Sequence, residues 1–268
     1  MPFQHHNQLK FYSFDLFSDG GNSSGKGVYQ GIFTRHGGVS PQPWASLNTG
    51  GLSGDTRENV IENRRRVFDV FGLPVESLFD VWQVHGDKVI STNAPRPLDE
   101  PHQKADAIIT NRTDITLMMR FGDCVPVFFW DPIQKVVAIA HAGWPGTVAQ
   151  IVVKTVNTMC EKHYCETHNI LAGIGPSISA AKYEVKEDVT SQVRASLGED
   201  ATEVILASEG RTYLDLWRSN QILLQRAGLL PEHIQISNIC TASNIDDWYS
   251  HRGEHGKTGR FAALIALK

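Results

Sequence analysis

The chain has 268 residues, of which 41% are hydrophobic and 20% charged, and a net charge of −4. This composition is typical of a globular protein with a substantial core and disfavours nucleic acid or an anionic membrane as a partner. No stretch approaches the roughly 18 apolar residues of a membrane span. The N-terminus lacks a signal-peptide pattern and the four cysteines lack disulfide-framework spacing, so we expect a cytoplasmic protein with reduced thiols.

The predicted elements form one continuous domain over residues 1–268. A polar loop at 18–27 separates an early strand from the strand GIFTR, and the Pro-rich segment 93–104 is predicted to be a surface loop. Between these loops, residues 56–71 have apolar side chains at helical spacing. Asp55 is the candidate N-cap of this helix.

Three short apolar runs, at 115–121, 125–130 and 135–142, predict buried strands. The remaining predicted helices lie at 147–161, 185–197 and 212–227, and the remaining predicted strands at 169–175, 234–237 and 261–268. Because helices and strands do not alternate strictly, the order favours an α+β fold with a mixed sheet and an outer layer of helices.

Three potential metal ligands each stand where an apolar run meets a turn marked by Gly or Pro. They are His85 in WQVHG, Cys124 in FGDCVP and His141 in AHAGW. Two imidazoles and one thiolate can hold zinc or copper and leave a fourth position open for water or substrate. The same atoms also suit a metal-free cysteine hydrolase, with Cys124 as nucleophile and His141 as base. A binding protein without catalytic activity is the third hypothesis.

Two neighbouring features support a site in this region. Asp123 lies between two apolar strands, where a carboxylate is costly unless it caps a turn or serves a site. After His141, the sequence GWPG predicts a tight turn and a helix that begins near Thr147. The free N–H groups at that helix start would attract an anion.

A second group of potential ligands is crowded into the sequence CEKHYCETH, at Cys160, His163, Cys165 and His168. On a helix, His163 and Cys165 point about 160° apart, so no single face gathers all four side chains. We therefore expect a solvated helix end here rather than a zinc site.

Several motifs occur in a fixed order over residues 32 to 268: TRHGGVSPQPWASLNTG, GDTRENVIENRRRV, QVHGDKV, ADAIITN, GDCVPV, HAGWPGT, CTASN and SHRGEHGKTGR. Together they resemble the bacterial YfiH-type multifunctional purine nucleoside enzymes, also called the laccase-domain or polyphenol oxidase family. The resemblance implies a layered α/β sandwich of mixed sheets flanked by helices, a fold shared with a group of cysteine hydrolases. It also implies a zinc ion held by His85, Cys124 and His141.

The resemblance implies purine nucleosides and phosphate as partners. The sequence leaves open whether the chain is a monomer or a homodimer. The implied activities are phosphorolysis of adenosine, inosine, guanosine and methylthioadenosine, and hydrolytic deamination of adenosine. Editing of peptidoglycan precursors is an alternative. Copper-dependent phenol oxidation is disfavoured, because reducing oxygen by four electrons needs several coppers and the chain has no His-x-His pair.

The family pattern also suggests roles for individual residues. Asp123 is a candidate for the proton transfers. Arg64 matches a family arginine that we expect to bind phosphate, and Arg35 and Asn48 are expected to hold phosphate or ribose hydroxyls. Pro145 replaces the arginine that usually follows the tryptophan of HAGW; proline suits the first turn of a helix.

Four aromatic residues are candidates to stack on a purine, although each could equally belong to the core. They are Trp82, Phe121, Trp144 and Tyr183.

Overall fold

A computed structural model describes residues 2–17, 27–51, 53–97 and 99–268. All but one residue of the loop predicted at 18–27 therefore lies outside the described residues. The strands are β1 Phe3–His6, β2 Leu9–Tyr12, β3 Val28–Phe33, β4 Leu78–Phe79, β5 Val89–Ser91, β6 Ala107–Thr110, β7 Thr116–Phe121, β8 Val125–Asp131, β9 Val136–Ala142, β10 Leu171–Ile174, β11 Ile205–Ser208, β12 Arg211–Leu214, β13 Ile234–Ile236 and β14 Phe261–Leu267. The helices are α1 Arg57–Asp69, α2 Trp144–Val148, α3 Ile151–His163, α4 Glu187–Leu197, α5 Ala201–Val204 and α6 Leu216–Arg226.

Most of the strands form two six-stranded sheets. The first has the order β1-β2-β3-β14-β7-β4 and the second the order β13-β10-β8-β9-β6-β5, while β11 and β12 form a separate hairpin. Both sheets are mixed, since β4–β7, β5–β6 and β10–β13 are parallel pairs and the neighbouring pairs are antiparallel. The predicted α+β fold with mixed sheets is confirmed.

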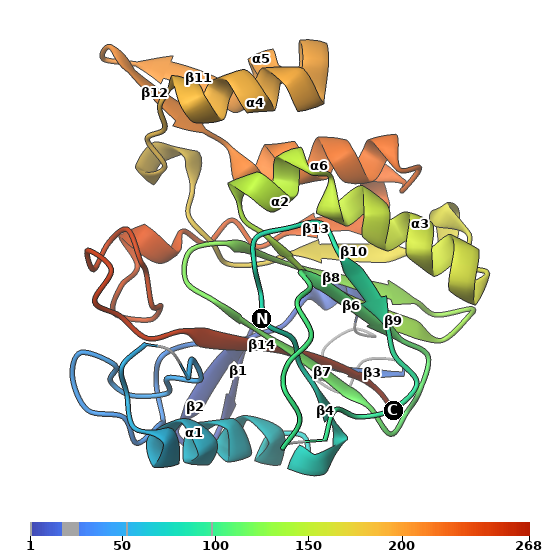
Figure 1. Cartoon of the computed structure of the whole chain (residues 1–268), viewed down its shortest axis with the longest axis vertical. Helices are drawn as coiled ribbons and strands as arrows, with labels where there is room; N and C mark the ends of the chain where they lie inside the picture. Colours follow the sequence, from blue (N-terminus) through green and yellow to red (C-terminus); the bar gives the residue numbers. More distant parts are fainter. Residues whose placement is uncertain (1, 18–26, 52, 98) are drawn as a thin grey trace.

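The sheets and helices are stacked as helix, sheet, sheet and helices (Figure 1). Helix α1 covers the outer face of the first sheet, and α2, α3 and α6 cover the outer face of the second. Strand β8 shows why the central strands are apolar on both faces. Val127 and Phe129 pack in the cluster under the helices, whereas Phe128 and Trp130 pack between the two sheets.

Two predicted helix boundaries were wrong at their N-terminal ends. Helix α1 begins at Arg57, and its N-cap is Thr56, whose hydroxyl accepts a hydrogen bond from the N–H of Asn59. The helix predicted at 147–161 is divided into α2 and α3, because Gln150 adopts the left-handed conformation with φ of 62°. A single left-handed residue does not change the spacing of apolar side chains, so the sequence pattern does not show this break.

No helix within the described ranges is long and apolar enough to cross a bilayer.

The helix predicted at 212–227 was also wrong over its first residues. Residues 211–214 form β12, which pairs with β11 through a turn at Glu209 and Gly210. Both turn residues have positive φ, as a two-residue hairpin turn requires. Helix α6 then starts after Asp215, whose side chain accepts a hydrogen bond from the N–H of Arg218.

Candidate metal centre

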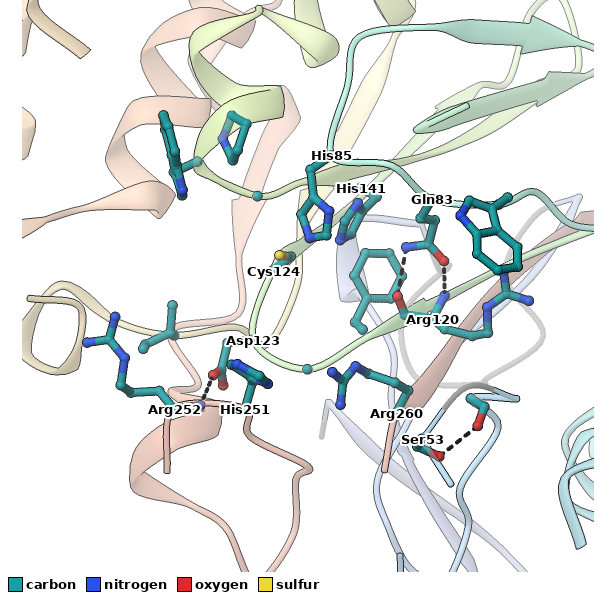
Figure 2. A pocket seen from close by; sticks show the side chains of 18 of the residues that line it. Ser53, Gln83, His85, Arg120, Asp123, Cys124, His141, His251, Arg252 and Arg260 are labelled. Atoms are coloured by element: carbon teal, nitrogen blue, oxygen red, sulfur yellow. Dashed lines mark hydrogen bonds between the residues drawn. The ribbon is translucent and has the colours of Figure 1, made fainter. Parts of the chain in front are cut away.

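The structure brings His85, Cys124 and His141 together. His85 lies in the loop after β4, Cys124 in the turn between β7 and β8, and His141 on β9. One ligand atom of each lies within 4.8 Å of the others, and the described part of the chain has no second group of this kind. Figure 2 shows both imidazoles directed toward the Cys124 sulfur. Because His141 is buried and His85 exposed, the group faces solvent on one side.

Gly143 lets the chain pass close to this group. A Cβ atom at this position would lie 2.9 Å from the Cys124 Sγ and 3.1 Å from the His85 Cδ2. The φ of Gly143 is −69°, which any residue can adopt. The glycine of AHAGW is therefore required for space and not for backbone conformation.

Asp106 is a buried carboxylate that fixes both histidines, and sequence reasoning missed it. Its Oδ1 accepts hydrogen bonds from the His141 Nδ1 at 2.9 Å and from the His85 N–H at 2.9 Å. Its Oδ2 accepts from the Gly86 N–H at 2.7 Å. These bonds hold His85 at a φ of 59° and leave the Nε2 of His141, on the side of the Cys124 thiol, as the ligand atom of this ring.

The thiol and the buried imidazole shift one another's pKa. Burial raises the pKa of the Cys124 thiol, but the charge of His141 and hydrogen bonds with both histidines outweigh burial and lower it to about 6. Burial lowers the pKa of His141, whereas the Cys124 thiolate and Asp106 raise it to about 9. The thiolate is the form that binds metals and acts as a nucleophile.

The three residues lie in the wall of a cavity of about 960 Å³. This volume is at the upper end of the range for small-molecule sites, about 300 to 1,000 Å³. The four predicted stacking residues, Trp82, Phe121, Trp144 and Tyr183, all line it, as do Arg64 and Asp123.

A family model described as multi-copper polyphenol oxidoreductase laccase matches residues 29–268. The chain belongs to this laccase-domain family. The purine nucleoside phosphorylase YlmD of Bacillus subtilis is 38% identical over 253 residues, which is 92% of this chain and 91% of the relative. A purine nucleoside phosphorylase of Deinococcus radiodurans is 39% identical over 235 residues, 87% of each chain.

Two solved structures share the fold. The crystal structure of YlmD from Geobacillus stearothermophilus matches with a TM-score of 0.91 and 30% identity, covering 100% of this chain and 99% of the other. The crystal structure of the Bacillus licheniformis protein YfiH matches with a TM-score of 0.89, the same identity and the same coverage. The predicted family and its layered fold are thus confirmed.

Arg35 does not line the cavity. Its guanidinium donates to the carbonyl oxygens of Ala45 at 2.8 Å and Ile245 at 2.6 Å, pairs with Glu254 and lies over the Tyr249 ring. With its donors engaged in this way, Arg35 ties the segment after β3 to the loop before β14. Its part in holding phosphate or ribose, which the laccase-domain pattern suggests, stays a prediction.

Asn48 is fully buried and is likewise absent from the cavity wall. Its Oδ1 accepts from the N–H groups of Gly50 and Arg260, and its Nδ2 donates to Ser53 and Asp55. Asn48 therefore supports cavity residues from behind instead of reaching a ligand.

Asp123 lines the cavity, but both of its oxygens already accept hydrogen bonds. Oδ1 accepts from the Thr241 hydroxyl at 2.6 Å, and Oδ2 accepts from the Arg252 N–H at 2.7 Å. The carboxylate thus joins the β7–β8 turn to the C-terminal loops. Its predicted part in proton transfer stays a prediction.

The predicted anion site near Thr147 was wrong. Helix α2 begins at Trp144, has only five residues and has Pro145, which lacks an N–H, in its first turn. The N–H of Thr147 donates to the Gly143 carbonyl at 2.8 Å, so it is not free for a ligand.

The side chains of CEKHYCETH have separate partners. The His163 Nε2 is hydrogen-bonded to Ser91, Cys165 interacts with Asp131, and His168 pairs with Glu166.

A cationic cluster that the sequence did not predict contributes Arg120 and His102 to another part of the cavity wall. At its centre is Asp80, which is fully buried and pairs with Arg96 at 2.8 Å, Arg120 at 2.7 Å and His102 at 3.0 Å. Burial raises the pKa of Asp80, but the hydrogen bond with His102 and the charges of Arg120 and Arg64 hold it well below its usual range. Loop 93–104 thus supplies Arg96 and His102 to a buried ion-pair network.

Proposed function

We propose that this chain is a zinc-dependent purine nucleoside enzyme. Its reactions are the phosphorolysis of adenosine, inosine, guanosine and methylthioadenosine and the hydrolytic deamination of adenosine. The observation that carries the proposal is the approach of the His85, Cys124 and His141 ligand atoms to within 4.8 Å in the wall of a large cavity. The names of the relatives, purine nucleoside phosphorylases at up to 39% identity, support the substrate class.

The donor set fits zinc. Two imidazole nitrogens and one thiolate are ligands that zinc prefers, and copper can occupy the same set. Asp106 accepts from the His141 Nδ1 and orients that ring, as carboxylates commonly do behind a zinc-binding histidine. Bound zinc would supply a Lewis acid that activates water at neutral pH.

The remaining cavity residues bind and orient the substrate. Trp144 and Tyr183 offer aromatic faces to a purine. Arg64 supplies a cation for phosphate, whose oxygen attacks C1′ of the ribose while the bond from C1′ to the purine nitrogen breaks. In deamination, water adds at C6 of adenine and ammonia leaves. Asp123 is the candidate to carry protons to and from these groups.

The test is turnover of adenosine by metal-quantified protein, with the products separated by chromatography. We expect adenine in the presence of phosphate, inosine with or without it, and loss of both in His85→Ala. His168→Ala, which changes an exposed histidine paired with Glu166, is the matched control and should keep both activities. Zinc-loaded protein that forms neither product would contradict the proposal.

One observation favours a metal-free cysteine hydrolase as the second candidate. The Cys124 thiol contacts His141, whose Nδ1 is in turn hydrogen-bonded to Asp106. This order of nucleophile, base and orienting carboxylate is the arrangement of a catalytic triad. Such an enzyme would keep full activity after chelation, whereas iodoacetamide would alkylate Cys124 and abolish activity.

Polyphenol oxidation, which the family model's description suggests, fits this chain less well. Four-electron reduction of oxygen needs several coppers, and the described residues contain a single group of suitable ligands.

A further inference from the structure

We propose that Arg64, Arg120 and Arg260 form a binding site for a phosphoryl oxyanion in the cavity wall. The assignment of this site to the phosphate co-substrate rests on the proposed function. The binding of the anion itself can be tested separately.

The charge of the cavity wall is opposite to that of the whole chain. Four arginines line it, namely Arg64, Arg120, Arg252 and Arg260, against one carboxylate, Asp123. The whole chain carries a net charge of −4. A cleft lined with one sign of charge concentrates ligands of the opposite sign. The cavity therefore suits an anionic ligand.

Three of these arginines come from separate elements of the first sheet and its helix. Arg64 lies on α1, Arg120 on β7, and Arg260 directly before β14. Figure 2 shows Arg120 and Arg260 on the side of the cavity opposite Arg252, with Cys124 between the two sides. The first sheet and its helix thus supply this cationic side of the cavity.

Residues 48–50 hold two of these arginines in place. The Nε and Nη2 of Arg64 donate to the Thr49 carbonyl at 3.1 and 2.9 Å. The N–H and hydroxyl of Thr49 both donate to the Arg260 carbonyl at 2.9 Å, and Asn48 accepts from the Arg260 N–H at 2.9 Å. A Cβ at Gly50 would lie 2.8 Å from the Arg260 side chain, so this segment packs closely against it.

Both guanidinium groups keep hydrogen-bonding capacity for a ligand. The Arg64 Nη1 is 3.9 Å from the Asp80 Oδ2, which is beyond hydrogen-bond distance. Arg260 donates from Nη1 to the Gly259 carbonyl at 2.8 Å and forms no ion pair with any carboxylate in the described part of the chain. Largely buried guanidinium groups without a full counter-charge are costly, and a bound oxyanion would supply that charge.

The positive charge around Asp80 favours an anion at this site. Asp80 is one carboxylate facing three guanidinium groups, those of Arg64, Arg96 and Arg120. Burial lowers the pKa of Arg64 to about 10, so this group is still a cation at neutral pH.

The test is calorimetric titration of inorganic phosphate into the metal-loaded protein and its Arg64→Met and Arg260→Met variants. Hydrogen bonds to charged groups contribute about 1.5–3 kcal/mol, so the dissociation constant for phosphate should rise roughly 10- to 100-fold in each variant. Arg65→Met is the matched control. Its guanidinium lies on the same helix, is 54% exposed and pairs with Glu62 and Asp69, so the variant should bind phosphate like wild type.

Two results would overturn the site: no phosphate binding by the wild type, or equal binding by wild type and both variants. If Arg260→Met does not fold, Arg260→Lys keeps the charge and most of the packing but loses the planar fork, and should still weaken phosphate binding. Phosphate binding that depends on the arginines in a protein without nucleoside turnover would support the site and contradict the proposed function. Nucleoside turnover with an unchanged KM for phosphate in both variants would support the proposed function and contradict the phosphate site.

The same titration distinguishes two sources of the phosphoryl group. Adenosine is added only to His85→Ala, which is not expected to consume it; if the ligand is free phosphate, saturating adenosine leaves room for it and the two bind together. If the group belongs to a nucleotide, adenosine 5′-monophosphate binds more tightly than adenosine and displaces both, and this tighter binding is lost in Arg260→Met.

Discussion

Asp106 contacts two residues of the candidate metal centre, and its hydrogen bonds predict that it positions the two histidines. It accepts hydrogen bonds from the His141 Nδ1 and from the N–H groups of His85 and Gly86. We expect Asp106→Asn to weaken zinc binding about 10- to 100-fold, because the ring orientation of His141 is no longer fixed. Competition with a chelator measures the affinity.

The control for this variant is Asp114→Asn, which removes an exposed carboxylate paired with Arg112 and should leave zinc affinity unchanged. If Asp106→Asn lowers the melting temperature of the metal-free protein but keeps the wild-type zinc affinity, Asp106 is merely structural and the prediction fails.

At this scale, sequence reasoning found the candidate ligands but not their support. His85, Cys124 and His141 each end an apolar run beside a turn residue, which is a local signal. Asp106 precedes a strand in ADAIITN and contacts His141 across 35 positions of sequence. No local pattern marks such a contact. Arg35 and Asn48 show the opposite case, in which a family motif marks residues that support the fold.

The turn between β9 and α2 offers a prediction at the scale of an element. In Gly143→Ala the backbone conformation is tolerated, but the new methyl group would meet the Cys124 sulfur and the His85 ring. We expect zinc affinity to fall at least about tenfold, while the metal-free protein keeps a melting temperature within a few degrees of wild type. Zinc titration and thermal unfolding of the same preparations measure both.

Gly51→Ala is the matched control, since a Cβ there would meet no atom within 4 Å. Unchanged zinc binding in Gly143→Ala would mean that the centre rearranges freely and that the close approach of this turn is unimportant.

Helices and strands could be predicted where the pattern of apolar residues in the local sequence determines them. Strands β8 and β9 are covered on one face by helices and on the other by the first sheet, so their sequences are almost wholly apolar. The break between α2 and α3 depends on one left-handed residue, Gln150, and apolar spacing does not report it. The β11–β12 hairpin has short, exposed strands, so it lacks a buried face that would produce a pattern.

For the whole molecule, the buried network around Asp80 predicts acid sensitivity. It joins α1, β7 and loop 93–104 through ion pairs with Arg64, Arg120 and Arg96. The folded-state pKa of Asp80 is below its unfolded value of about 3.9. Its stabilising contribution is therefore fully present above that value and is lost as pH falls toward the folded-state pKa.

We expect Asp80→Asn to lower the free energy of unfolding by about 3–5 kcal/mol at pH 7, because it leaves buried guanidinium groups unpaired. The difference in free energy of unfolding between Asp80→Asn and wild type, measured by urea denaturation, should shrink as the pH is lowered from 5 to about 3. Asp114→Asn, at an exposed ion pair, should change little at any pH. A difference between Asp80→Asn and wild type that stays constant with pH would contradict this account.

The set of residues that forms the cavity wall could not be predicted from the sequence. Its cationic side combines Arg64, Arg120 and Arg260, which are far apart in the chain and meet only because α1, β7 and β14 pack together. Arg64 was expected to bind phosphate from a family motif alone. Arg120 and Arg260 carried no local signal, because an arginine at a strand end is usually a surface residue.

The central claim is that His85, Cys124 and His141 hold a catalytic metal with an open position. X-ray absorption at the zinc edge of the purified, zinc-quantified protein tests it most directly. We predict one zinc per chain with one sulfur ligand at about 2.3 Å and nitrogen or oxygen ligands at about 2.0–2.1 Å. The sulfur contribution should disappear in Cys124→Ser. A spectrum with several sulfur ligands, or one that is unchanged in Cys124→Ser, would place the metal elsewhere and contradict the account.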